Sequence, residues 1–474
     1  MAETDDKTAS PSPARQNVTA RSRPVDAAKA LQAAIRLHRK GDLDAAAKAY
    51  RGVLDLDPES SSAWINLGVL LRRMGQIDAA VICLSRGVSQ TRGDGPAWSN
   101  LGNALRAANR LEEARHAQET AIDLSPGASQ IHYNLGLVYR DLGDLDDAQQ
   151  CFRRAALLGY DKPDLAWDQA LTRLLSGDLA GGFRDYESRW SLPESPARHA
   201  DIPLWDGEDG TDKTILIHYE QGLGDTLQFC RYIPRLCDRF DTVLFEVQPP
   251  LIPLLSSSPG FEPVRFAERN GPPPACDVQS PLLSLPRHFH SGTASDFGDC
   301  PYLSAPEGGP MLPYAPRDHL KVGLVWAGKP SHRNDRNRSI RLADFARFLD
   351  VPNATFYSFQ VGPEARQIAA TGFTGLVHDC SPLIRHYGDT AALLKQVDIL
   401  ISVDTSVVHL AGGLGVDVWT LLPFAPDWRW QMQRGDTPWY PTMTLFRQTS
   451  PGDWREVLDR VRHALVARVA AKSG

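Results

Sequence analysis

The sequence predicts two kinds of structure in one chain, an α-helical repeat array followed by an α/β module with parallel sheets. Similar blocks begin at Ala63, Ala97 and Ile131, so that each lies 34 residues after the one before it. Past about residue 212 the pattern changes, and short apolar runs alternate with helical stretches. Such alternation is typical of α/β folds, in which helices connect parallel strands.

The composition is that of an ordinary globular protein. The chain has 474 residues, enough for roughly three domains. A formal net charge of −6 argues against nucleic acid as a partner. Seven cysteines without a C-x-x-C pair favour reduced thiols and a cytoplasmic location. The polar N-terminus is no secretory signal, and the absence of a long apolar run predicts no membrane span.

The sequence divides into five predicted parts. Residues 1–25 are rich in Ser, Pro, Ala and Arg and predict a disordered tail. Residues 26–190 carry the repeats, and the proline-bearing segment 191–212 is interpreted as a connector. Residues 213–312 and 313–474 are interpreted as two Rossmann-like lobes facing a cleft. Strands are predicted within them at 214–218, 242–247, 322–326, 355–360 and 399–403, and a final helix at about 453–470 should pack on the module.

The repeats share small and large residues over both predicted helices of each unit. Matching positions in the three clear copies are Leu67, Leu101 and Leu135, Gly68, Gly102 and Gly136, and Ala80, Ala114 and Ala148. A weaker copy spans residues 37–58. A degenerate fifth copy passes through Leu171, Gly177, Phe183, Tyr186 and Trp190. This period and pattern are identified as the tetratricopeptide repeat.

Stacked repeats of this type form a concave groove that commonly holds an extended peptide. Asn66, Asn100 and Asn134 recur in the first helix of each clear copy, so we expect them to line an acceptor groove. The alternative is that these asparagines serve packing or local hydrogen bonds.

The segment TILIHYEQGLGDTLQF, residues 214–229, organises the α/β module. An apolar strand leads to a turn with Gly222 and Gly224, and Asp225 follows at the start of a helix. Chemistry in open α/β folds is usually placed at such strand ends. Asp225 is therefore a candidate catalytic residue, and the two glycines are expected to shape the backbone turn. The alternative is a helix cap and an ordinary turn.

A second strand-to-helix junction lies in ISVDTSVVHLAGGLG, residues 401–415. Asp404, Thr405 and Ser406 open a helix, and His409 shares a face with Thr405. Free N–H groups at a helix start attract anions, so this segment predicts a phosphate site. An ordinary capped helix with a structural histidine is the alternative.

Two further segments predict contacts with a donor nucleotide. The loop at 329–339 carries Lys329, Arg336 and Arg338, a basic set suited to a diphosphate, although a solvated loop is the alternative. Asp427 and Trp428 lie in the aromatic segment PDWRW, which suits a nucleoside or else packs in the core. No metal-binding motif, phosphate-binding P-loop or G-x-S-x-G elbow is present.

Residues 204–465 resemble bacterial glycosyltransferases of the heptosyltransferase type, glycosyltransferase family nine, and most closely the group fused to tetratricopeptide repeats. The shared motifs are EQGLGDTLQFCRYIP, VGLVWAG with the SHRNDRNRS loop, VDTSVVHLAG, and DWRW followed by PWYP. The resemblance implies a GT-B fold, with the acceptor at the cleft and the nucleotide sugar on the C-terminal lobe. It also implies metal-independent, inverting transfer without a cofactor.

The family's proposed base matches Asp225, and its diphosphate-binding helix start matches Asp404, Thr405, Ser406 and His409. Arg338 stands where the family commonly has lysine. The sequence thus predicts transfer from a nucleotide sugar to a protein hydroxyl, with the acceptor docked by the repeats. By analogy with related repeat-fused enzymes, the expected acceptor is flagellin and the expected sugar is a nonulosonic acid. The alternatives are transfer to lipopolysaccharide or another surface glycan, and a non-catalytic adaptor.

Overall fold

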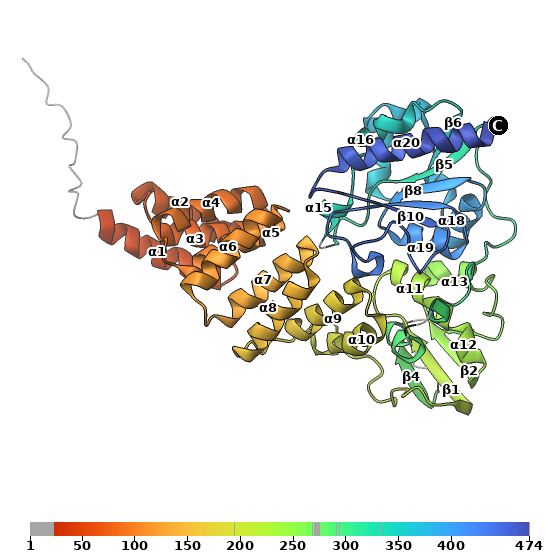
Figure 1. The fold of residues 1–474 in the computed structure, drawn as a ribbon, viewed down its shortest axis with the longest axis horizontal. Helices are drawn as coiled ribbons and strands as arrows, with labels where there is room; N and C mark the ends of the chain where they lie inside the picture. The colour runs from red at the N-terminus through yellow and green to blue at the C-terminus, as the bar shows by residue number, and fades with distance from the viewer. Residues whose placement is uncertain are drawn as a thin grey trace, which may run out of the picture. The chain divides into compact units, whose positions relative to one another are not determined.

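The computed structural model describes residues 23–193, 195–267, 269, 275–290, 292, 294–332 and 334–473. Most of the predicted tail, residues 1–22, therefore lies outside the described residues. Its last three residues, 23–25, belong to helix α1 (Arg23–Arg39). Contacts group the chain into two compact units that meet between Asn134 and Leu135, and each unit is described by itself (Figure 1).

The first unit consists of paired antiparallel helices. Its helices after α1 are α2 (Leu43–Leu56), α3 (Ser61–Arg73), α4 (Ile77–Gln90), α5 (Gly95–Ala107), α6 (Leu111–Leu124) and the start of α7 (Ser129–Leu142). The helices of a pair approach closely because a glycine faces the partner helix. A Cβ atom on Gly68 would lie 2.6 Å from Cγ of Leu84, so only glycine fits there. These pairs confirm the predicted helical repeat array.

The second unit begins with the rest of the array. It continues through α8 (Leu145–Leu157), α9 (Asp164–Ser176), α10 (Leu179–Asp185) and the 3₁₀ helix η1 (Tyr186–Ser191). Gly177 ends α9 in the left-handed conformation, with φ of 93°, which glycine adopts without strain. The described residues thus contain ten α-helices before the first strand.

A four-stranded parallel sheet follows. It has the order β3-β2-β1-β4, formed by β1 (Gly210–His218), β2 (Phe240–Glu246), β3 (Arg265–Ala267) and β4 (Val278–Pro281). The central strand β1 is apolar and buried at Ile215, Leu216 and Ile217, as expected for a strand covered on both faces. Its connecting helices are α11 (Leu223–Phe229), α12 (Pro234–Cys237), α13 (Ile252–Leu255) and α14 (Pro286–Phe289).

The C-terminal part contains a six-stranded parallel sheet in the order β10-β9-β8-β5-β6-β7. Its strands are β5 (Leu320–Val325), β6 (Ala354–Ser358), β7 (Val377–Asp379), β8 (Ile399–Val403), β9 (Val418–Leu422) and β10 (Met443–Arg447). Its helices are α15 (Asp335–Arg338), α16 (Leu342–Leu349), α17 (Gln367–Ala370), α18 (Tyr387–Leu394), α19 (Ser406–Gly413) and α20 (Trp454–Ser473). The two parallel sheets confirm the predicted α/β character of this region.

Helices cover both faces of the six-stranded sheet (Figure 1). Ile401 and Val403 pack with residues of α16 and α20, whereas Leu400 packs with residues of α18 and α19. The apolar side of α20 is buried at Val457, Leu458, Val461 and Leu465, as predicted for the final helix. Among the described residues, no helix has the length and apolar character needed to cross a membrane.

Candidate functional site

Asp225 lies in the first turn of α11, which a short loop, residues 219–222, connects to the carboxyl end of β1. Gly222 is the N-cap of this helix, and its N–H donates a hydrogen bond of 2.7 Å to Oδ2 of Asp225. Gly222 has φ of −74°, so its backbone conformation alone does not require glycine. One oxygen of the carboxylate is therefore held by the backbone at the helix start.

Gly224 does not lie in the predicted turn but inside α11. A Cβ atom there would lie 3.1 Å from Cδ2 of His409 and 3.3 Å from Cα of Ser406. The missing side chain thus lets the first turns of α11 and α19 pack together. Gly224 joins the two predicted functional segments, one from each sheet, at a single place.

Arg429 forms an ion pair with Asp225, in which Nη2 of the guanidinium donates a hydrogen bond to Oδ1 of the carboxylate. It belongs to the 3₁₀ helix η9 (Trp428–Trp430), far away in the sequence. Its Nε donates to Oε1 of Gln228 at 2.6 Å, and its Nη1 donates to Oδ1 of Asp427 at 2.8 Å. No pattern in the sequence predicts this contact. Arg429 does stand between two tryptophans, Trp428 and Trp430, a local sign of a guanidinium packed among rings.

The surroundings of Asp225 both raise and lower the pKa of its carboxyl group. Burial raises the pKa of the Asp225 carboxyl, while the positive charge of Arg429 and the N–H of Gly222 lower it, and the net direction is upward. The side chain is 19% exposed, so solutes retain access to it. An accessible carboxylate with raised pKa has the properties of a general base.

The start of α19 is polar on one side and tightly packed on the other. Thr405 is the N-cap, and the hydroxyls of Ser406 and Tyr387 share a hydrogen bond of 2.7 Å. His409 is buried, its Nδ1 lies 2.9 Å from the hydroxyl of Tyr440, and its ring stacks on Trp430 at 5.4 Å. Burial lowers the pKa of His409 well below its ordinary value, so the imidazole is neutral.

Arg338 connects the basic loop to the start of α19. Its Nη1 donates a hydrogen bond of 3.1 Å to the backbone carbonyl of Asp404. Burial, with a contribution from the charge of Asp427, raises the pKa of Asp404 to about 6. Arg338 and Asp427 thus both lie close enough to act on Asp404, while their role as a donor site stays a prediction.

The remaining predicted donor contacts differ in accessibility. Lys329 and Arg336 are exposed, and Asp427 has 40% of its side chain exposed. Trp428 is buried, and its ring packs against Phe183 at 5.6 Å. The indole of Trp428 therefore lies in an aromatic core, with the guanidinium of Arg429 4.4 Å from its ring centre.

The three groove asparagines are not equivalent. Asn66 and Asn100 are half-buried. Asn134 is 6% exposed; its Nδ2 donates to Oγ of Ser99 at 2.9 Å, and its Oδ1 accepts from Gln130 at 3.1 Å. For Asn134 the structure therefore shows a local hydrogen-bonding role.

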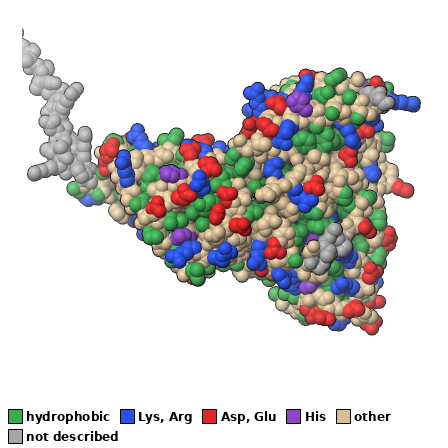
Figure 2. All heavy atoms as spheres, in the orientation of Figure 1, with side chains coloured by type: hydrophobic (Ala, Val, Ile, Leu, Met, Phe, Trp, Pro, Cys, Tyr) green, Lys and Arg blue, Asp and Glu red, His purple; other side chains and the backbone are tan. Residues whose placement is uncertain are grey.

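Within the described part of the chain, no group of three or more His, Cys, Asp or Glu side chains is arranged to hold a metal ion. Metal-independent chemistry stays a prediction. On the face shown in Figure 2, acidic and basic side chains are interspersed, and the expectation that nucleic acid is not a partner also stays a prediction.

Comparison with known protein families identifies the repeat part. Three family models, each described as a tetratricopeptide repeat, match residues 37–105, 93–156 and 133–196. The chain therefore contains tetratricopeptide repeats, as predicted, and repeats of this class bind protein partners.

Among curated proteins, the chain is similar to protein FlbA of Caulobacter vibrioides, with 26% identity over 346 residues. The matched region is 64% of this chain and spans 55% of the length of that relative.

Solved structures match about a third of the chain at low TM-scores. PilF of Pseudomonas aeruginosa is 21% identical, with a TM-score of 0.32, over 35% of this chain and 76% of that one. TTC0263, a tetratricopeptide-repeat protein of Thermus thermophilus, is 23% identical, with a TM-score of 0.32, over 36% and 93%. MamA of Desulfovibrio magneticus RS-1 is 27% identical, with a TM-score of 0.27, over 28% and 75%.

Proposed function

We propose that the protein is a glycosyltransferase of the GT-B type that moves a sugar from a nucleotide-sugar donor to a hydroxyl of a protein docked by the repeats. The observation that carries the proposal is the packing of α11 on α19 at Gly224. This contact brings a carboxylate with raised pKa, Asp225, beside the helix start to which we assign the donor phosphate. Inverting transfer needs these two functions in one place.

In the proposed reaction, an acceptor hydroxyl oxygen attacks the anomeric carbon of the sugar. The carboxylate of Asp225 takes the proton of that hydroxyl as the new C–O bond forms. The bond between the anomeric carbon and the phosphate oxygen breaks, and its electron pair leaves with the nucleotide. Arg429 keeps a positive charge beside Asp225 and thereby favours the ionised form that can accept a proton.

On the donor side, positive charge and N–H groups would meet the phosphate as its negative charge grows. Arg338 is fixed at the start of α19 by its bond to the carbonyl of Asp404, and Lys329 and Arg336 are exposed nearby in sequence. The first N–H groups of α19 and the hydroxyls of Thr405 and Ser406 would complete the contacts. Such donors need no reorganisation during the reaction, which is the source of their effect.

The acceptor is proposed from the repeats. Tetratricopeptide repeats at residues 37–196 suit a polypeptide better than a lipid-linked saccharide. Flagellin, with a nonulosonic acid as the sugar, is the particular pair we propose to test first. The competing proposal is a non-catalytic adaptor, because the matching family models cover the repeats alone.

Two measurements on the full chain separate these proposals. Calorimetric titration with UDP-, GDP- and CMP-activated sugars should reveal a donor that binds, whereas an adaptor would bind none. The protein and that donor are then incubated with flagellin or with lipopolysaccharide, and the masses of the products are measured by mass spectrometry. A sugar mass added to flagellin alone supports the proposal, and a sugar added to lipopolysaccharide alone replaces the protein acceptor by a surface glycan.

A further inference from the structure

We propose that the last repeat unit, formed by α9, α10 and η1, is a positioning element of the site, because it holds both partners of the Asp225–Arg429 pair. Its catalytic consequence rests on the proposed function, whereas its structural consequence does not. The repeats would then do more than dock a partner.

The repeat pattern itself marks this unit as different. Small residues recur 34 residues apart at Gly87, Ala121 and Ala155, but the next equivalent position is Arg189. Tyr186 takes the position of Phe152, which the first copy also fills with a tyrosine, Tyr50, so Arg189 is the residue that sets the last unit apart. In a repeat array each unit normally covers its neighbour, and a terminal unit needs a different cover. Here the α/β module provides that cover, and the guanidinium of Arg189 replaces the usual small side chain.

Arg189 fixes the loop that leads to Asp225. It is 1% exposed, yet its Nε and Nη2 donate to the carboxylate of Glu220 at 2.8 and 3.0 Å. Nη1 donates to Glu187 at 2.7 Å, and Nη2 also donates to the hydroxyl of Ser284 at 2.7 Å. A buried guanidinium bonded on all sides is rigid, because moving it would leave charges unpaired in the interior.

Tyr186 holds the next residue of the same loop. Its hydroxyl accepts a hydrogen bond of 3.1 Å from Nε2 of Gln221, and its ring packs on Trp167 of α9 at 4.7 Å. Gln221 directly precedes Gly222, whose N–H binds the carboxylate of Asp225. The chain of contacts from η1 to the Asp225 carboxylate is therefore continuous, and each link is polar and directional.

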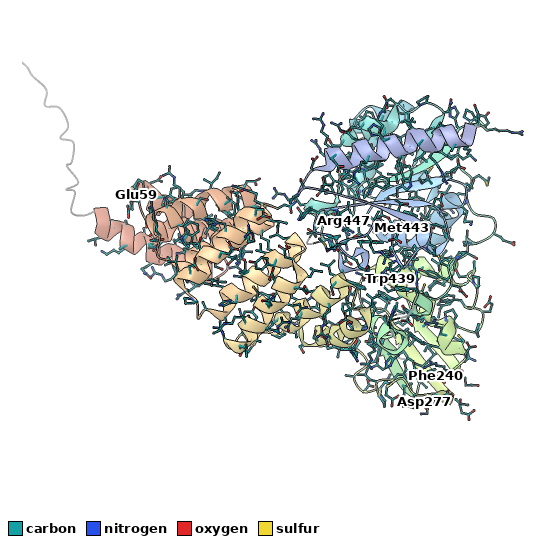
Figure 3. The ribbon with its side chains drawn as sticks, viewed as in Figure 1. Glu59, Phe240, Asp277, Trp439, Met443 and Arg447 are labelled. Atoms are coloured by element: carbon teal, nitrogen blue, oxygen red, sulfur yellow. The ribbon has the colours of Figure 1, made fainter. Side chains whose placement is uncertain are left out.

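The same unit also holds η9, which carries Arg429. Phe183 of α10 packs against Trp428 at 5.6 Å and against Trp439 at 6.4 Å, and Trp439 is labelled in Figure 3. The side chain of Gln431 lies 3.5 Å from where a Cβ atom of Gly177 would be. Helix α9 and η9 are thus packed together directly beside the guanidinium.

Both residues of the ion pair are therefore held in place by the last repeat unit. Gln221 and Glu220 connect this unit to the loop before Asp225, and Trp428 and Gln431 connect it to η9, which carries Arg429. Misplacement of a catalytic group by about 1 Å can cost roughly 100-fold in rate, so such a support is of direct value to the reaction. Tyr186 and Arg189 act as positioning residues, since neither is bonded to the Asp225 carboxylate.

The test compares Tyr186→Phe with Tyr160→Phe in the full chain. Tyr160 is a matched control, because it is also buried and its hydroxyl binds Asp164 within the repeats at 3.1 Å. Hydrogen–deuterium exchange is followed at residues 220–226 and 427–432. We expect Tyr186→Phe to speed exchange at residues 220–226 by about 3- to 10-fold, because this is the effect of losing one hydrogen bond on local opening. Tyr160→Phe should leave exchange at these residues unchanged.

Gln221→Met removes the same hydrogen bond from its other side and keeps the size of the side chain. The double variant Tyr186→Phe/Gln221→Met should then show no more exchange than either single variant. Where transfer is measurable, kcat should fall by about 10-fold with an unchanged KM for the donor. Phe183→Leu should speed exchange at 427–432, the Arg429 side of the pair.

The outcomes separate this inference from the proposed function. If the wild-type chain transfers no sugar but the exchange results hold, the last unit is still the support of the pair and the enzyme proposal fails. If transfer is found and Tyr186→Phe exchanges at 220–226 like the wild type, the positioning role is overturned. Additive effects in the double variant would also overturn it.

Discussion

The carboxylate of Asp225 and the guanidinium of Arg429 form an ion pair although they lie 204 positions apart in the chain. The other oxygen of the carboxylate is held by the N–H of Gly222, and the other nitrogens of the guanidinium are held by Gln228 and Asp427. A carboxylate bound on both oxygens has one orientation. This pair therefore fixes the direction in which Asp225 can accept a proton.

Replacing Asp225 by asparagine should abolish most transfer. Asparagine keeps an oxygen that can accept from Gly222, so the local fold should persist while the base is lost. We expect kcat to fall by about 100- to 10,000-fold, the usual contribution of general base catalysis, with donor affinity retained. Asp212→Asn, at the exposed start of the same strand, is the control and should behave like the wild type. Normal turnover by Asp225→Asn would remove Asp225 as the base.

Replacing Arg429 by lysine should affect stability and the pH dependence together. A lysine keeps the positive charge but cannot bind Asp225, Asp427 and Gln228 at once, and each buried group left without its hydrogen bond costs about 1–3 kcal/mol. Arg429 lowers the pKa of Asp225, and the ammonium of a lysine would be held less closely to that carboxylate. The pKa of Asp225 should therefore rise further, and the acidic limb of the rate profile should move to higher pH.

Arg434→Lys is the matched control for Arg429→Lys. Arg434 forms an exposed pair with Asp436, and exposed pairs contribute about 1 kcal/mol or less. Thermal unfolding and a pH–rate profile of both variants give the comparison. An unchanged acidic limb in Arg429→Lys would mean that Arg429 does not set the proton affinity of Asp225.

Much of the fold was predictable because it is encoded locally. The 34-residue period predicts the helical pairs, and continuous apolar runs predict β1, β2, β5, β6 and β8. The sequence does not predict the short outer strands β3, β4 and β7, since three or four residues provide too little pattern. β9 and β10 were missed although each has five residues.

The site was predictable only where it depends on helix starts. Asp225 and the Asp404–His409 segment follow apolar strands, so their places could be inferred. The pairing of Asp225 with Arg429 is a long-range contact and has no local signature. The sequence predicts Gly224 in a turn. In the structure a glycine is needed there because a side chain would press against His409 and Ser406, and this contact forms only when α11 and α19 pack together.

The raised pKa of Asp404 predicts a pH dependence of donor binding. At about 6 it lies above the ordinary value of about 3.9 for aspartate. Above pH 6 the ionised carboxylate should repel the donor phosphates, whose own charge is constant in this range. We expect tighter donor binding at pH 5.5 than at pH 7.5, and Asp404→Asn should remove the difference. A difference that persists in Asp404→Asn would assign it to another group.

The same shift has a consequence for stability. A carboxyl whose pKa is higher in the folded state binds protons more tightly there, so its contribution to stability is present below about pH 4 and is lost as pH rises through about 6. Asp404→Asn should therefore raise the melting temperature at pH 7.5 more than at pH 4.5. An equal change at both values would contradict the burial effect.

The groove asparagines should separate into two classes on substitution. Asn66→Ala and Asn100→Ala should weaken binding of the acceptor protein with little change in melting temperature, because both side chains are half-buried. Asn134→Ala should instead lower the melting temperature, since the buried Ser99 hydroxyl loses the hydrogen bond from Asn134 and an unmade buried hydrogen bond costs about 1–3 kcal/mol. Acceptor binding that is unchanged in Asn66→Ala/Asn100→Ala would move the docking surface away from these residues.

Gly224→Ala tests whether the junction of α11 and α19 is the centre of the site. The added methyl would lie 3.1 Å from His409 and 3.3 Å from the backbone of Ser406, so α19 must shift by a few tenths of an ångström. Because this shift moves the proposed phosphate contacts relative to Asp225, we expect weaker donor binding and slower transfer in a chain that still folds. Gly52→Ala in α2, where the added methyl meets no atom within 4 Å, is the control, and it should stabilise that helix by about 1 kcal/mol. Unchanged donor binding in Gly224→Ala would show that the donor lies elsewhere on the six-stranded sheet.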